Sequence, residues 1–376
     1  MTKTDLDIFW REDAIAHEQN CFNPAAKQVA LGIRMSDECV FAELGEQGDP
    51  WGHTPRDRRI ELNKRYNDKA EQVVGKRLLN ENPENFTLPD MHFPYVKRIG
   101  EVFEGRYSMG DGTGEWLHGS ASTPKELEAL LDRVEKLDFR EYLYPENWEA
   151  EKKRLYETYG LKPHLMRHIR GPVTLAMSIY GEENLIFLYY DEPELFKRFG
   201  EVVLSTTLKI AKLADEEAGY TEATRPRGFS FADDNCALLT PDMYEIFGYP
   251  VLKGLFETYS PDEKDSRYQH SDSAMAHLLP ILGRLNFNGC NFGPTVLVDE
   301  IRKYMPNARI DGCIHPITFM NNDIDQLVSE VRRDIAMEKA SGVRGLNINT
   351  AGSINNGSML TSMLKVMETI AEYGQY

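Results

Sequence analysis

The strongest constraint on the fold is a repeated order of segments, in which short apolar runs alternate with stretches of helical periodicity. Strand-like runs begin near residues 228, 267, 288, 308 and 345, and helix-like stretches fill about 241–259, 275–285, 295–305, 322–341 and 357–373. Pro163–Ile169 reads as one more strand upstream. Strand–helix alternation predicts a parallel sheet, and eight such units closing on themselves predict an α/β fold of the TIM-like (β/α)8 barrel type. Two further units are therefore expected before residue 163.

Polar side chains stand at the carboxyl ends of these predicted strands, which is where α/β barrels build their active sites. The residues concerned are Asp233 and Asp234 after the first run, His270 and Asp272 after the second, Cys290 in the third, Cys313 and His315 after the fourth, and Asn349–Gly352 after the last. We take these strand ends as the candidate site.

Each candidate also has a structural interpretation. Asp233 and Asp234 are adjacent, so in a strand they face opposite sides. We favour Asp234 for the pocket and expect the other acid to be an ion-pair partner or a loop cap. A lone His such as His270 is often structural, and Asp272 could cap a helix at 274–285. Cys313 and His315 have metal-pair spacing, although a buried free Cys is commonly an apolar filler.

The first 120 residues are expected to form an N-terminal extension that caps the barrel, with residues 121–376 forming its main part. Val29–Met35 has strand character, and Glu43–Asn63 is polar and is expected to be a long loop. Tyr95–Gly119 predicts a β-hairpin around the glycine-rich turn Met109–Gly114. A strong helix start is expected at Thr123, followed by Pro124 and Glu126.

Composition excludes several classes of protein. The 376 residues carry a net charge of −17, which disfavours binding to nucleic acid or to anionic membranes. Five scattered cysteines without a Cys-x-x-Cys motif suit a reduced, cytoplasmic setting better than a disulfide framework. The chain has no apolar run near eighteen residues and no signal-like start, so we expect neither export nor a membrane span.

Four motifs appear in an order that resembles the uroporphyrinogen decarboxylase superfamily. They are Gly171-Pro-Val-Thr-Leu-Ala, Asp191-Glu-Pro-Glu, Ala232-Asp-Asp-Asn with Thr240-Pro-Asp-Met-Tyr, and His270-Ser-Asp with Leu278-Leu-Pro. The resemblance covers roughly residues 120–376 and implies a TIM-like barrel. One branch of the superfamily decarboxylates uroporphyrinogen, and the other uses zinc to move methyl groups to or from corrinoids.

The decarboxylase branch fits less well than the methyltransferase branch. Its members carry Met-Arg-Gln-Ala-Gly-Arg-Tyr near the N-terminus, and the nearest stretch here is Gly32-Ile-Arg-Met. The methyltransferases bind zinc through His-x-Cys and a later Cys. His270 matches the first ligand, the second falls on Asp272, and the third falls near Ala351, so two thiolates are replaced. Zinc accepts Asp oxygen and His nitrogen.

The resemblance therefore implies a corrinoid-dependent methyltransferase, such as an O-demethylase component of anaerobic metabolism. Together with the strand-end positions, it leads us to predict Asp234, His270, Asp272 and His315 as catalytic residues, and His270, Asp272 and Cys313 as metal ligands. The chain lacks the cobalamin motif Asp-x-His-x-x-Gly, so a partner protein would supply the corrinoid. A decarboxylase-like lyase and a non-catalytic corrinoid- or tetrapyrrole-binding accessory protein are the alternatives. The sequence does not decide the oligomeric state, and a homodimer is one option.

Overall fold

The computed structural model describes residues 1–48, 50, 54–110 and 114–376, which divide into two compact units. Unit 1 comprises Met1–Phe86 and Gln269–Tyr376, and unit 2 comprises Thr87–Tyr268. This division differs from the predicted boundary at residue 120. The first 86 residues belong with the C-terminal part of the chain because strand β1 (Ala30–Leu31) pairs in parallel with β9 (Leu346–Thr350).

In unit 1 the parallel strands follow the order β1-β9-β8-β7, and the end of β6 (Arg267–Ser271) belongs to the same unit. The other strands are β7 (Gly289–Phe292) and β8 (Arg309–Ile314). The helices are α1 (Lys3–Ala16), α2 (Glu38–Leu44), α3 (Arg56–Val74), α13 (Leu279–Leu282), α14 (Val298–Tyr304), α15 (Pro316–Met320), α16 (Ile324–Ser341) and α17 (Leu360–Tyr373).

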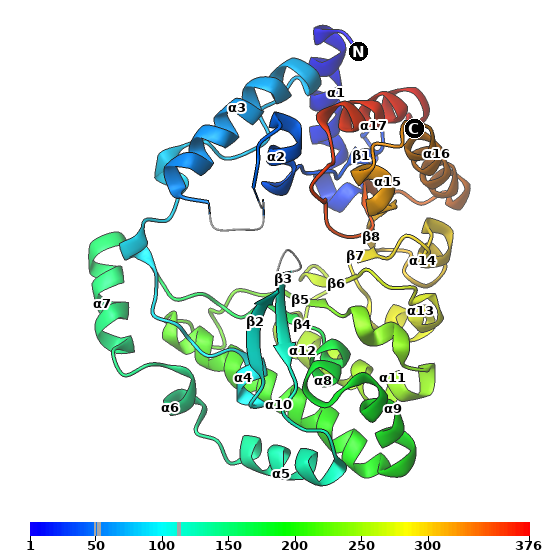
Figure 1. Cartoon of the computed structure of the whole chain (residues 1–376). Helices are drawn as coiled ribbons and strands as arrows, with labels where there is room; N and C mark the ends of the chain where they lie inside the picture. The colour runs from blue at the N-terminus through cyan, green and yellow to red at the C-terminus, as the bar shows by residue number, and fades with distance from the viewer. Residues whose placement is uncertain (49, 51–53, 111–113) are drawn as a thin grey trace. The chain divides into compact units, whose positions relative to one another are not determined.

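The helices of unit 1 bury one face each. Asp323 caps α16 by accepting a hydrogen bond from the Gln326 amide, and Gly342 ends it at a φ of 67°. Helix α17 packs against α16 and α3 (Figure 1). Its buried face is Leu360, Ser362, Met363, Val366, Met367, Thr369 and Ile370. This spacing of mostly apolar residues is what a helix needs to cover a sheet or another helix.

The expected long loop at Glu43–Asn63 was wrong over its last part, since α3 begins at Arg56. That segment is polar overall, but Leu62, Tyr66 and Ala70 recur every four residues and are buried. The helical stripe starts only at the edge of the predicted loop, which is why composition alone concealed it. Trp51 and His53 lie outside the described residues.

Unit 2 holds the remaining strands: β2 (Arg106–Gly110), β3 (Gly114–His118), β4 (His168–Arg170) and β5 (Phe229–Ala232). Its helices are α4 (Ile99–Val102), α5 (Pro124–Glu135), α6 (Phe139–Leu143), α7 (Trp148–Tyr159), α8 (Pro172–Tyr180), α9 (Glu182–Asp191), α10 (Pro193–Glu217), α11 (Pro241–Ile246) and α12 (Gly248–Tyr259). Strands β4 and β5 are parallel, whereas β2 and β3 form the expected hairpin. Residues 111–113 of its predicted turn are outside the described residues.

Local sequence signals explain several boundaries in unit 2. The Thr123 hydroxyl accepts from the Glu126 amide and the Glu126 carboxylate reaches back, which is the predicted capping box of α5. Pro172 opens α8, and Pro193 opens α10.

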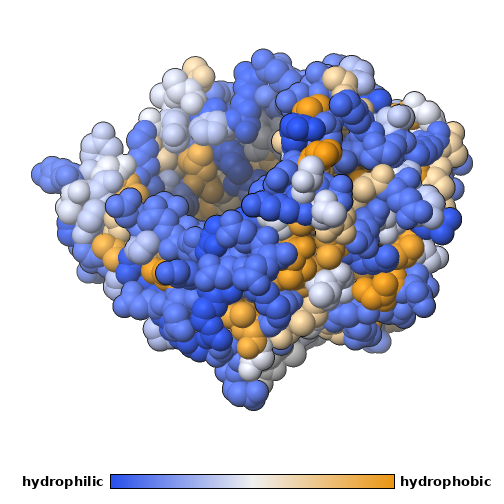
Figure 2. All heavy atoms as spheres, turned by 90° about the horizontal axis from the view of Figure 1, so that it is seen from above, coloured by the Kyte–Doolittle hydropathy of each residue, from blue (hydrophilic) through white to orange (hydrophobic). Residues whose placement is uncertain are grey.

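Hydrophilic residues dominate the face drawn in Figure 2, as the net charge of −17 would lead one to expect. Apolar residues on this face occur in small groups between them. No helix among the described residues combines the length and the apolar character that crossing a membrane requires.

Candidate metal centre

The candidate site in unit 1 is a histidine–carboxylate pair at the end of β6. His270 is the fourth residue of the strand, and Asp272 follows its last residue. The His270 Nε2 atom lies 3.1 Å from Asp272 Oδ1. The side chains are 26% and 53% exposed, so a ligand can reach both. The structure therefore brings together two of the three predicted metal ligands.

Asn291 on β7 fixes the orientation and the tautomer of His270. Its amide nitrogen donates to the carbonyl oxygens of Asp311 and Thr350, the latter at 3.0 Å. Its Oδ1 must therefore be the acceptor in the 2.7 Å contact with His270 Nδ1. The proton of His270 is held on Nδ1, so Nε2 presents its lone pair or takes a second proton. Outer partners of this kind orient the His ligands of metal sites.

The geometry of the pair suits a shared cation. A lone pair on Nε2 and a carboxylate oxygen 3.1 Å apart repel one another unless a proton or a metal ion lies between them. Two ligand atoms about 2.0–2.2 Å from a tetrahedral zinc lie roughly 3.3 Å apart, close to the observed spacing. The nitrogen and oxygen donors of His270 and Asp272 therefore fit two positions of a zinc site.

Two glycines allow neighbouring loops to pack closely on Asp272. A Cβ atom on Gly352, after β9, would lie 2.5 Å from Asp272 Oδ1, and φ at Gly352 is 123°. A Cβ atom on Gly293, after β7, would lie 2.6 Å from the Asp272 carbonyl oxygen. The loop that contains Ala351 is thus next to Asp272, where the resemblance implies a third ligand.

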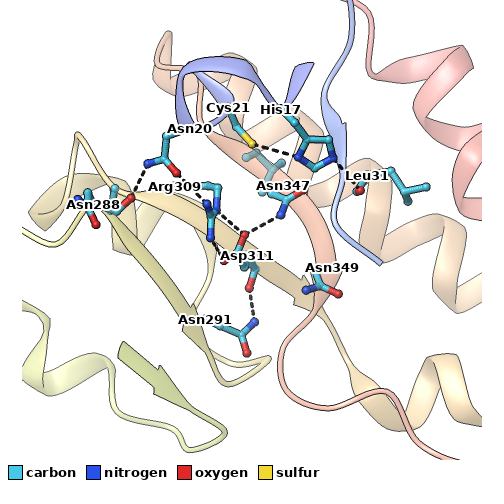
Figure 3. A network of polar contacts seen from close by, with 12 residues as sticks. His17, Asn20, Cys21, Leu31, Asn288, Asn291, Arg309, Asp311, Asn347 and Asn349 are labelled. Carbon is cyan, nitrogen blue, oxygen red and sulfur yellow. Dashed lines mark hydrogen bonds and ion pairs between the residues drawn. The ribbon is translucent and has the colours of Figure 1, made fainter. Parts of the chain in front are cut away.

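A buried polar network extends behind Asn291 through β8 and β9 (Figure 3). Arg309 Nε and Nη2 each donate to the Asp311 carboxylate at 2.8 Å, and the Asn347 amide donates to it at 2.7 Å. Asp311 is 5% exposed. Three donors hold the Asp311 carboxylate and thereby fix the position of this residue. The Asp311 carbonyl oxygen in turn accepts the hydrogen bond that orients Asn291.

The other predicted residues of unit 1 lie on β8 and directly after it. The Cys313 thiol is 1% exposed and donates to the Val296 carbonyl at 3.4 Å, and burial raises its pKa well above the ordinary value. Such a thiol stays protonated and suits a structural role. His315 caps α15, since its Nδ1 accepts from the Ile317 amide at 3.2 Å. Asp272 is not the cap of the next helical turn, whose flanking residue is Met275.

The paired acids after β5 lie in unit 2 and have different surroundings. Asp233 is fully buried, and its Oδ1 accepts from the amide and the hydroxyl of Thr174 at 2.8 and 2.9 Å. Burial raises its pKa to about 6. Gly171 leaves the space that the Asp233 side chain occupies. Asp233 thus holds the first turn of α8, whereas Asp234 is half-buried at the start of the next turn, Asp234–Leu238.

Sequence reasoning missed Asn291, although one signal could have pointed to it. It is a lone amide inside the strand Gly289–Phe292, whose four residues are all buried. A polar side chain at such a position must find a partner.

Comparison with known proteins decides the family. The model of the uroporphyrinogen decarboxylase family (URO-D) matches residues 99–373. The chain belongs to the uroporphyrinogen decarboxylase family. Its fold is accordingly the predicted TIM-like barrel. A search of curated proteins by sequence finds no match.

Two solved structures place this family member among its structural neighbours. A methyltransferase from Methanosarcina mazei matches with a TM-score of 0.57 and 14% identity, over 96% of this chain and 98% of that chain. A B12-independent methionine synthase from Shewanella sp. W3-18-1, in complex with selenomethionine, matches with a TM-score of 0.37 and 12% identity, over 86% and 90% of the two chains. Because the second TM-score is low, only the first likeness supports the fold.

Proposed function

We propose that this family member is a methyltransferase that moves a methyl group from a small methylated substrate, such as a methyl ether, to a corrinoid carried by a partner protein. The observation that carries the proposal is His270, whose proton is held on Nδ1 while Nε2 faces Asp272. The Methanosarcina mazei structure described as a methyltransferase supports it further, because the two folds agree over nearly the whole of both chains.

In this proposal His270 and Asp272 hold a zinc ion. When bound, zinc supplies Lewis acidity to the oxygen from which the methyl group departs. Asn291 keeps the imidazole in the ligating tautomer, and Gly293 and Gly352 keep the loop around Asp272 tightly packed. Cys313 is left out of the ligand set because its thiol is buried and protonated.

One role in the proposed reaction remains to be assigned, that of the proton donor to the departing oxygen. Within unit 1, His315 stays the predicted residue for it. Positioned donors of this kind contribute about 10²–10⁴-fold to the rate. His315→Gln would therefore lower methyl transfer while leaving zinc binding unchanged, which separates this role from that of a ligand.

The direct test is metal content. We expect about one zinc per chain after dialysis against zinc and removal of the excess, and almost none in His270→Ala. His277→Ala is the matched control, since His277 is exposed in the same unit and outside the pair. Zinc retained by His270→Ala would contradict the proposed site.

The activity test uses the zinc-loaded chain with a reduced corrinoid protein and a panel of methyl ethers, amines and thiols. Methylation of the corrinoid from an ether, lost in His270→Ala, is the expected result. Absence of transfer from every member of the panel would overturn the proposed reaction even if zinc binds.

A decarboxylase-like lyase keeps one supporting observation, a cavity in unit 2 lined by arginine and lysine side chains. This alternative predicts release of carbon dioxide from a small acid by the metal-free chain. Decarboxylation that is unchanged in His270→Ala would favour it over methyl transfer.

A further inference from the structure

Unit 2 contains a cavity of about 750 Å³ that the proposed zinc site does not use. It lies among residues 87–99, which precede and enter α4, residues 161–166 before β4, the strand β4 itself, and Ile210 and Ala214 of α10. Its volume falls within the range of about 300–1,000 Å³ that is typical of small-molecule sites. All the lining residues belong to unit 2, so the cavity is complete within that unit.

The charge of the cavity is opposite to that of the protein. Lys97, Arg98, Lys162 and Arg170 line it, and none of the described lining residues is acidic. The whole chain carries 60 acidic and 43 basic residues. A local excess of cationic groups in an acidic protein favours an anionic ligand, because the surrounding negative charge repels anions elsewhere on the surface.

Three of the four cations are already engaged by protein groups. Arg98 binds the Glu115 carboxylate at 2.5 and 3.0 Å. The Lys97 and Lys162 ammonium groups lie over the Tyr142 and Tyr220 rings, 3.9 and 4.8 Å from their centroids. These contacts hold the three side chains in place.

Arg170 differs from them. It is half-buried at the carboxyl end of β4, and within the described parts of the chain its guanidinium makes no hydrogen bond or ion pair. The hydrogen bond from Arg98 lowers the pKa of the Glu115 carboxyl, and the charge of Arg170 helps to lower it. Burial raises the pKa of the nearby Tyr107 hydroxyl, and the charges of Arg98 and Arg170 oppose that rise. A half-buried guanidinium with open donors is suited to a carboxylate, which it can bind through two parallel hydrogen bonds.

An aromatic wall completes the cavity. The Phe93 ring lies 5.7 Å from the Trp148 ring and 6.2 Å from the His164 ring, and Tyr144 lies 4.6 Å from Trp148. Trp148 is held in turn by a 2.7 Å hydrogen bond from its Nε1 to the buried Glu217. Aromatic side chains with fixed rings favour a flat apolar ligand that packs edge-to-face or offset against them.

We propose that this cavity binds an aromatic carboxylic acid, with the carboxylate on Arg170 and the ring against the aromatic wall of Phe93, Tyr144, Trp148 and His164. Free phosphate would leave the wall unused, and a neutral aromatic compound would leave the Arg170 guanidinium donors without a carboxylate acceptor. The inference does not rest on methyl transfer at His270, because every group it uses belongs to unit 2.

The test is calorimetric titration of the full chain with 4-methoxybenzoate and with the neutral 4-methoxybenzamide, in the absence of zinc and corrinoid. We expect the acid to bind at least about tenfold more tightly than the amide, because a hydrogen-bonded charge contributes about that factor or more. Arg170→Gln should lower the affinity for the acid to that for the amide. Equal binding of acid and amide by the wild type would overturn the role of Arg170.

Two further variants make the test specific. Arg106→Gln removes the same charge from an exposed position on β2 outside the cavity and should leave binding unchanged. If Arg106→Gln lowers the affinity for the acid as much as Arg170→Gln does, the acid responds to the general charge of the protein, and the proposed site is overturned. Phe93→Ala should weaken acid and amide by a similar factor, and an unchanged affinity would overturn the placement of the ring.

The outcome separates this inference from the proposed function. His270→Ala should bind 4-methoxybenzoate as the wild type does, with an unchanged thermal midpoint. Acid binding without zinc binding would leave the cavity standing and overturn the metal centre. Zinc binding without acid binding would do the reverse.

Discussion

Two aspartates follow neighbouring strands of the sequence and look alike in it, yet their surroundings differ. Asp233, after β5, is fully buried and accepts two hydrogen bonds from Thr174. Asp272, after β6, is half-exposed and faces the Nε2 nitrogen of His270. The first acid has its partners within the fold, and the second is placed to share a cation. The position of a carboxylate at a strand end therefore does not identify its role, whereas its burial and its partners do.

The largest expected difference between the two acids is in stability. Asp233→Ala removes the acceptor for two buried donors of Thr174, so we expect it to lower the free energy of unfolding by about 2–3 kcal/mol. Asp272→Ala should change it by no more than about 0.5 kcal/mol, because the side chain is half-exposed, while zinc binding is lost. Urea denaturation and zinc content measure the two effects.

A larger loss of stability in Asp272→Ala than in Asp233→Ala would contradict this comparison of the two aspartates. A stable Asp233→Ala would mean that the Thr174 amide finds another acceptor. A strongly destabilised Asp272→Ala would assign that acid a structural role and remove it from the proposed site. Asp242→Ala serves as a control for both variants, since Asp242 is exposed in the first turn of α11.

The next expected effect concerns the tautomer of His270. Asn291→Ala removes the acceptor for the Nδ1 proton, and loss of such an outer partner typically costs 10–100-fold in metal affinity. Asn291→Asp keeps an acceptor oxygen and should recover part of the loss. Zinc titrations at several pH values test this, because a merely structural role would weaken binding without changing its dependence on pH.

Asn349→Ala is the matched amide control for Asn291. The Asn349 Oδ1 accepts from the neighbouring Thr350 amide at 2.9 Å, on the adjacent loop-forming end of β9. An equal loss of zinc affinity in both variants would show that any amide lost from these strand ends disturbs the site, and Asn291 would lose its specific role.

A smaller effect is expected at the glycine that packs on Asp272. Gly352→Ala would place a Cβ atom 2.5 Å from Asp272 Oδ1, so the carboxylate must shift and zinc affinity should fall by about tenfold or less. Gly342→Ala is the control, because φ there is also positive and the space is open. Both changes should cost about 1–2 kcal/mol of stability, since each residue is left-handed. An unchanged zinc affinity in Gly352→Ala would separate this loop from the site.

The sequence predicted strands β5 to β9 well because their signal is local, whereas the strand expected at Pro163–Ile169 begins only at His168. Apolar runs bounded by turn residues and followed by helical stripes do not depend on distant contacts. The observed strands β5 to β9 begin within about two residues of the predicted positions. The N-terminal region was harder, because β1 is two residues long and is defined by its pairing with β9, more than 300 positions away.

In the candidate site, too, the sequence predicted the local features and not those that depend on distant contacts. His270 and Asp272 are two residues apart, so their proximity follows from the strand itself. The role of Asn291 depends on the pairing of β7 with β6, and that of Gly352 depends on the approach of the loop after β9 to Asp272. Spacing along the chain predicts neither contact. The burial of Cys313 and Asp233 likewise depends on the helices that cover them, which periodicity predicts only as faces and not as contacts with a particular side chain.

The two aspartates should also differ in the response of stability to pH. The pKa of Asp233 is raised from 3.8 to about 6 by burial. The folded state therefore binds a proton more readily than the unfolded state between these values, and the contribution of this group to the free energy of unfolding falls as the pH rises from about 4 to about 6. Asp233→Asn keeps an acceptor for Thr174 without a charge, so its stability relative to the wild type should increase across that range. Thermal midpoints measured at intervals from about pH 4 to about pH 7 test this, with Asp242→Asn as the exposed control. Parallel curves for the wild type and Asp233→Asn would mean that the buried carboxylate is already ionised in the folded protein, and the contrast with Asp272 would then rest on hydrogen bonding alone.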